Sequence, residues 1–117
     1  MFETINKAKK LFSFKVQPTE KQIEKLVISM FDLSIPSNSS GLDLYVYFRK
    51  LISYNNFGLE AITSLASREI GNGKYEFCSL LESRKYNKYM IYSEMFGKLI
   101  FNDYDAYVNF LRNHNIG

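Results

Sequence analysis

The sequence has no tryptophan, one cysteine, one histidine and two prolines among its 117 residues. A single cysteine excludes a disulfide within the chain, which fits a reducing compartment. No apolar run approaches the roughly 20 residues that a membrane-spanning helix needs. The N-terminus also lacks the separate apolar region and small-residue cleavage site of a secretory signal. These absences predict a soluble, cytoplasmic protein that does not associate with a membrane.

Residues that usually carry catalysis or bind metals are also scarce. His114 lies between two asparagines, and no second histidine or neighbouring nucleophile completes a triad. Residues 102–105 lack the ligand spacing and glycine of a calcium loop, and residues 71–74 lack the glycine spacing of a phosphate loop. Cys78 lies in an apolar segment, where a small buried hydrophobe is favoured over a reactive thiol. We expect no cofactor, no metal site and no enzymatic activity.

The chain is rich in residues that build a core. Apolar residues make up 46% of it and aromatic residues 16%, and every aromatic is a tyrosine or a phenylalanine. This composition predicts a folded chain, and 117 residues suffice for one ordinary domain. We therefore expect a single domain spanning residues 1–117. The net charge of +3 is far below that of a dedicated nucleic-acid binder.

Apolar residues at helical spacing dominate the first half of the chain. They predict two helices. The apolar face of the first comprises Phe2, Ile5, Ala8 and Phe12, and that of the second comprises Ile23, Leu26, Val27, Met30 and Phe31. The second helix begins with a capping box, in which Thr19 and Gln22 satisfy each other's backbone amides. Pro36 and residues 37–41 then form a loop. Residues 42–53 alternate like a strand at first but continue without a turn signal, so helix is favoured over strand.

A fourth helix is predicted for residues 59–70, where apolar residues recur at helical intervals. The Gly-Asn-Gly sequence that follows is the sharpest turn signal in the chain, since both residue types adopt positive φ at low cost. Residues 74–81 then form a strand, and the polar residues 82–87 link it to an antiparallel hairpin. The strands of that hairpin are residues 89–94 and 98–101.

The end of the chain returns to helical spacing. The apolar face of this helix comprises Tyr104, Tyr107, Val108 and Leu111. Asn102 or Asp103 can cap it, because either side chain accepts from the amides of the first turn. Helices therefore come first, three or so strands second and a helix last. This order predicts an α+β fold, with N-terminal helices packed on one face of a small antiparallel sheet and a C-terminal helix closing it.

Two segments are candidate partner-binding surfaces. The first lies in the polar link and comprises Arg84, Lys85, Tyr86 and Lys88. Such a set can contact phosphates and stack on bases, but Tyr and Arg are also preferred anchors of protein interfaces. The second is a turn with two aromatics that local structure does not require, Tyr54 and Phe57. For both segments, the alternative is that the aromatic side chains pack back onto the core.

Several segments together resemble the SUKH superfamily. They are Gln22-Ile-Glu-Lys-Leu26 followed by Ile35-Pro36, an aromatic helix through Tyr45 and Phe48, the turn Asn55-Asn-Phe-Gly58, and the final pattern Gly-x-Leu-Ile-Phe-x-x-Tyr-x-x-Tyr-x-x-Phe-Leu. These domains occur widely as bacterial immunity proteins that neutralise a cognate toxin. The resemblance implies a protein-binding domain, with more sheet in residues 59–70 than the helical spacing predicts.

We therefore expect a non-catalytic protein-binding domain, with a bacterial immunity protein that neutralises a toxin as the leading hypothesis. The alternative is a small nucleic-acid-binding accessory protein of viral or mobile-element origin, which uses the basic polar link together with the N-terminal lysines. An enzyme ranks third. The exposed edge of so small a sheet leaves a dimer or a strand-addition contact open.

Overall fold

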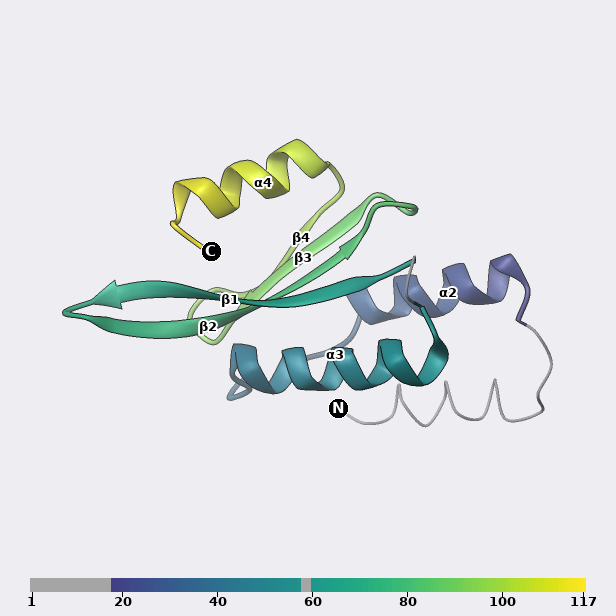
Figure 1. The fold of residues 1–117 in the computed structure, drawn as a ribbon, viewed down its shortest axis with the longest axis horizontal. Coiled ribbons are helices and arrows are strands. Elements are labelled where there is room, and N and C mark those ends of the chain that lie inside the picture. The colour runs from purple at the N-terminus through teal and green to yellow at the C-terminus, as the bar shows by residue number, and fades with distance from the viewer. Residues whose placement is uncertain (1–17, 58–59) are drawn as a thin grey trace.

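The computed structural model describes residues 18–57 and 60–117. The predicted first helix, with Phe2 and Phe12, lies outside these ranges. The elements in Figure 1 are α2 (Glu20–Phe31), α3 (Gly41–Asn55), β1 (Ile62–Gly71), β2 (Lys74–Ser83), β3 (Lys88–Ser93), β4 (Gly97–Phe101) and α4 (Tyr104–Asn113). This order is the predicted α+β fold. No helix in the described ranges is long and apolar enough to cross a membrane.

The four strands form one antiparallel sheet in the order β1-β2-β3-β4. β1 and β2 have ten residues each, whereas β3 has six and β4 has five. Since β3 pairs only with residues 79–83 of β2, the rest of the β1–β2 hairpin extends beyond the sheet as a two-stranded ribbon (Figure 1). On this ribbon Arg68 forms a 2.6 Å ion pair with Glu76 and lies 4.3 Å from the ring centre of Phe96. These contacts tie the ribbon to the β3–β4 turn.

Residues 62–71 form strand β1, so the helix predicted for residues 59–70 is wrong. A buried helical face would include Ile62 and Ile70, but these residues are 55% and 42% exposed. The Gly-Asn-Gly turn has positive φ at all three residues, which closes a tight hairpin and brings β1 against β2. Pairing with β2 therefore overrides the local periodicity.

Both helices before the sheet begin with a capping box. In α2, Thr19 and Gln22 exchange the predicted hydrogen bonds at 3.2 and 2.8 Å. In α3, the Asp43 N–H donates to the Ser40 hydroxyl at 3.1 Å, and the Ser40 N–H donates to the Asp43 carboxylate at 3.2 Å. The helix favoured for residues 42–53 is confirmed, and the loop before it supplies its cap.

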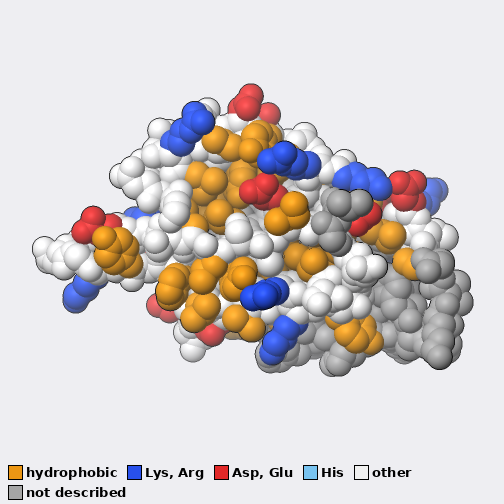
Figure 2. All heavy atoms as spheres, in the orientation of Figure 1, with side chains coloured by type: hydrophobic (Ala, Val, Ile, Leu, Met, Phe, Trp, Pro, Cys, Tyr) orange, Lys and Arg blue, Asp and Glu red, His pale blue; other side chains and the backbone are white. Residues whose placement is uncertain are grey.

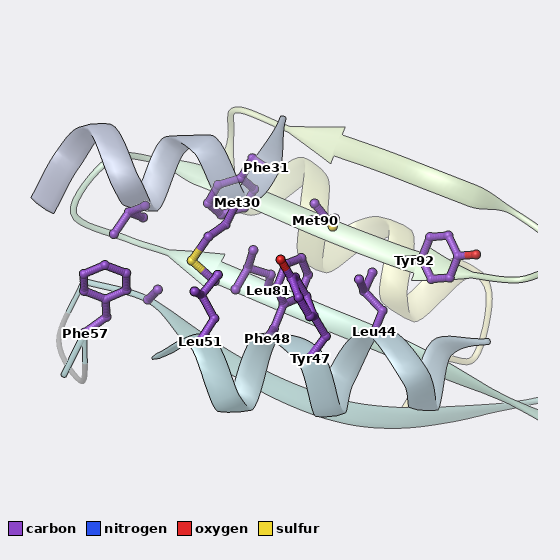
Figure 3. Packing of buried hydrophobic residues seen from close by; sticks show 12 residues of the cluster. Met30, Phe31, Leu44, Tyr47, Phe48, Leu51, Phe57, Leu81, Met90 and Tyr92 are labelled. Carbon is purple, nitrogen blue, oxygen red and sulfur yellow. The ribbon is translucent and has the colours of Figure 1, made fainter. Parts of the chain in front are cut away.

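Helices cover both faces of the sheet and so create two cores. On one face, α2 and α3 pack their apolar side chains against β2 and β3 (Figure 3). On the other face, α4 packs around Tyr107, which is 1% exposed. Neighbouring β3 residues Met90 and Ile91 belong to different cores, because alternate residues of a strand face opposite sides. The prediction of helices on one face is therefore incomplete: a strand that is apolar on both sides needs cover on both.

Cys78 is fully buried in the second core, as a small hydrophobe. Burial raises the pKa of its thiol from 9.0 to about 11, with a smaller contribution from Glu76. Because the folded chain holds this proton more tightly than the unfolded chain, Cys78 leaves stability unchanged below pH 9.0 and lowers it as the pH rises toward about 11.

We expect the free energy of unfolding to fall by about 2–3 kcal/mol more in the wild-type chain than in Cys78→Ala across this pH range. Urea denaturation at a series of pH values measures both slopes. The Cys78→Ala variant controls for the tyrosines whose pKa values burial also raises, such as Tyr92. Equal slopes in the two chains would contradict the prediction.

Candidate protein-binding surface

Both segments predicted as candidate surfaces lie at the end of the molecule where α2 begins and α3 ends (Figure 1). The turn between β2 and β3 meets the start of α2 through Lys85, whose ammonium donates to the Glu20 carboxylate at 2.8 Å. Tyr86 packs against the same core that contains Phe57. The fold therefore brings together parts of the two segments that lie far apart in the sequence.

Arg84 contacts α4 from this turn. Its guanidinium lies 4.9 Å from the ring centre of Tyr104 and donates to the Tyr104 hydroxyl at 3.3 Å. The Glu82 carboxylate lies 3.9 Å from the same guanidinium. Next to this pair, the Lys88 ammonium donates to the Asn102 side-chain oxygen at 3.1 Å. Arg84 and Lys88 thus each contact a group of the chain itself near the start of α4, while 70% of the Arg84 side chain stays exposed.

Lys85 and Tyr86 contact the helices before the sheet and the first core, whereas Arg84 contacts α4. The hydrogen bond that Lys85 donates to Glu20 raises the pKa of Lys85, and the same bond lowers the pKa of Glu20. The Tyr86 ring is half-buried against the first core, and burial raises the pKa of its hydroxyl. Tyr86 therefore follows the alternative interpretation, in which the aromatic side chain packs inward.

The second predicted segment splits between surface and core. Tyr54 is 51% exposed at the end of α3, whereas Phe57 is 2% exposed and belongs to the first core. Phe57 is therefore not part of the exposed surface. The backbone N–H of Phe57 donates to the Ile52 carbonyl at 3.1 Å, so the chain at Phe57 stays bonded to the end of α3.

The mixed-charge surface is our name for the side chains in and around the β2–β3 turn that carry charges of both signs, together with Tyr104: Glu20, Glu82, Arg84, Lys85, Lys88 and Tyr104. Sequence reasoning missed Tyr104 because it assigned this residue to the buried face of the last helix, although the ring is 39% exposed. It also missed the carboxylate partners Glu20 and Glu82, for which the sequence offers no local signal. Figure 2 shows side chains of both charges next to one another at this end of the molecule.

The basic character of the chain does not come from this surface. Residues 1–17 contain four lysines and one glutamate, so they carry the whole formal net charge of +3. The described residues are therefore neutral overall. Among these described residues, no group of three or more His, Cys, Asp or Glu side chains could hold a metal ion.

Other exposed aromatic side chains lie at the opposite end of the molecule, on the β1–β2 ribbon. Tyr75 is 65% exposed and Phe77 is 48% exposed, two positions apart on the same side of β2.

Comparison of the chain with protein-family models, with curated proteins and with solved structures finds no match. The assignment of a function therefore depends on the geometry of these surfaces and on the residues themselves.

Proposed function

We propose that this chain is a non-catalytic protein-binding domain, and that its partner is a toxin domain that it neutralises, as the SUKH resemblance implies. The observation that carries the protein-binding part is the mixed-charge surface. Its cations are already paired with a carboxylate, an amide or an aromatic ring of the chain. Arg and Tyr are common anchors of protein interfaces, and a side chain that already has a contact within its own chain loses less conformational freedom on binding.

The mixed-charge surface is compatible with a bacterial immunity protein, because such a protein can bind its toxin through charges of both signs and does not need a wholly acidic face. Interfaces with complementary charges of both signs set partner choice and orientation, and the described residues supply both signs in equal number. The resemblance also implies sheet in residues 59–70, which is where β1 begins. The toxin surface that meets Arg84 and Lys85 would then carry its own mixture of acidic and basic groups.

The alternative, a nucleic-acid-binding accessory protein, is less favoured by the same contacts. Phosphate binding requires cations that are free to neutralise several phosphates. Here the Lys85 ammonium lies 2.8 Å from the Glu20 carboxylate, and the Arg84 guanidinium contacts both Glu82 and Tyr104. A phosphate would have to displace these partners.

The test is affinity capture of the tagged chain from its native cells at low and high salt, with protein and nucleic acid both identified. We expect one stoichiometric protein partner that survives high salt and whose toxicity is suppressed by co-expression of this chain. Arg84→Ala and Tyr54→Ala should each weaken that complex about tenfold or more, as loss of an interface anchor does.

Tyr75→Ala is the matched control, because Tyr75 is an exposed tyrosine at the other end of the molecule. A complex weakened by Tyr75→Ala but not by Tyr54→Ala or Arg84→Ala would place the interface on the ribbon instead. Nucleic acid in the eluate that is lost at high salt, with no protein partner, would overturn the proposed function.

A further inference from the structure

The two edges of the sheet differ in how they are protected from pairing with another strand. β4 is a short edge of five residues, and its Lys98 ammonium donates to the carbonyls of Phe31 and Leu33, both at 2.9 Å. β1 is twice as long, and its residues 62–67 include no charged residue and no proline. Its one irregularity lies between Glu69 and Gly71, at the far end. Short length, charge, proline and bulges are the usual protection of an edge strand, and within the described part of the chain residues 62–66 have none of these.

Beyond residue 66, at Ser67, this edge already pairs with one residue of the chain. The Ser67 N–H donates to the Gly117 carbonyl, and the Gly117 N–H donates to the Ser67 carbonyl, both at 3.2 Å. This reciprocal exchange is the pattern of an antiparallel pair. Because backbone groups alternate in direction along a strand, Thr63 and Leu65 present theirs to the same side as Ser67. In the described part of the chain, no hydrogen bond reaches those groups.

We propose that the β1 edge pairs with the β1 edge of a second copy of this chain, through residues 62–66. The Ser67–Gly117 pair limits the register, since it blocks any overlap that reaches Ser67. The symmetric antiparallel pairing of the remaining stretch is centred on Ser64. It places Ser64 opposite the partner's Ser64, and Thr63 opposite the partner's Leu65, whose backbones exchange hydrogen bonds.

A second copy suits this edge in both side chains and charge. On one face of the joined sheet, the 55% exposed Ile62 would lie beside the partner's Ala66, which is itself only 8% exposed. At the centre, two serine side chains can hydrogen-bond across the strands. The pairing places no charged residues opposite each other, because residues 62–66 contain none. Such a contact is self-complementary, as a two-fold interface requires.

The contact area of one strand pair is small, so the dimer should be weak and depend on concentration. Sedimentation equilibrium over a wide range of concentration should show association of the wild-type chain. Ser64→Lys and Ser64→Glu should each weaken it about fivefold, since either puts like charges directly opposite at the two-fold axis. A mixture of the two variants should recover association as a heterodimer, because the charges are then opposite.

Ser34→Lys and Ser34→Glu are matched controls at an exposed serine outside the sheet, and they should associate as the wild-type chain does. As a second measurement, the Leu65 backbone N–H should exchange with solvent more slowly in concentrated than in dilute solution. A chain that stays monomeric throughout would overturn the proposal. So would Ser64 variants that associate as strongly as the wild-type chain, or a mixture that recovers nothing. These outcomes do not depend on whether a toxin is the partner.

Discussion

Gly41→Ala should cost about 2–3 kcal/mol of stability, although alanine is the better helix former. Gly41 is the first residue of α3, and a Cβ built there would overlap the Phe77 carbonyl group, 2.6 Å from its carbon. That group belongs to the backbone of β2, so it cannot turn aside as a flexible side chain would. The gain in helix propensity is about 1 kcal/mol at most. Overpacking of a rigid site costs about 1–3 kcal/mol and often more against backbone, so the clash should prevail.

The free energy of unfolding from urea denaturation measures this effect. Gly117→Ala is the control, because a Cβ at Gly117 meets no atom within 4 Å. It should change stability by less than about 0.5 kcal/mol. A Gly41→Ala chain as stable as the wild type would mean that α3 shifts freely over the sheet. The same result would show that the contact between Gly41 and Phe77 does not fix the position of the helix.

The sequence predicts the elements whose signals are local. The capping box at Thr19 and the apolar spacing behind it identify α2 from a few neighbouring residues. The terminal helix is similar, since the Ala106 N–H donates to the Asp103 carboxylate at 3.0 Å as the predicted cap requires. These elements are stabilised by contacts within one or two turns, so a short stretch of sequence contains the information.

The prediction failed where distant residues decide the structure. Residues 59–70 are compatible with helical spacing, and pairing with β2 determines that they contain a strand. Candidate site residues show the same limit, because Lys85 pairs with Glu20, 65 positions away. An aromatic residue in a turn also carries no local sign of its direction. Tyr54 points to solvent and Phe57 into the core, only three positions apart.

Tyr107→Ala should be among the most destabilising single substitutions in the chain, at about 3–5 kcal/mol. Tyr107 is 1% exposed, and its ring stacks on Tyr89 with 5.1 Å between ring centres. Its hydroxyl donates to the Glu82 carboxylate at 2.9 Å. Burial, the charge of Glu82 and that hydrogen bond all raise the pKa of the Tyr107 hydroxyl. Tyr107→Phe keeps the ring and removes only the donor, so it should cost about 1–2 kcal/mol.

The difference between these two variants separates packing from hydrogen bonding, and it bears on the candidate surface. Tyr107 connects α4 to Glu82, while Arg84 and Tyr104 lie on the exposed side of the same contact. Tyr104→Ala removes a 39% exposed ring and should cost only about 1 kcal/mol, which makes it the control for packing. If Tyr107→Phe weakened partner capture as much as Arg84→Ala does, Tyr107 would act by positioning the mixed-charge surface through Glu82. If Tyr107→Phe is captured like the wild-type chain, the contacts of Arg84, Lys85 and Lys88 keep that surface in place without the Tyr107–Glu82 hydrogen bond.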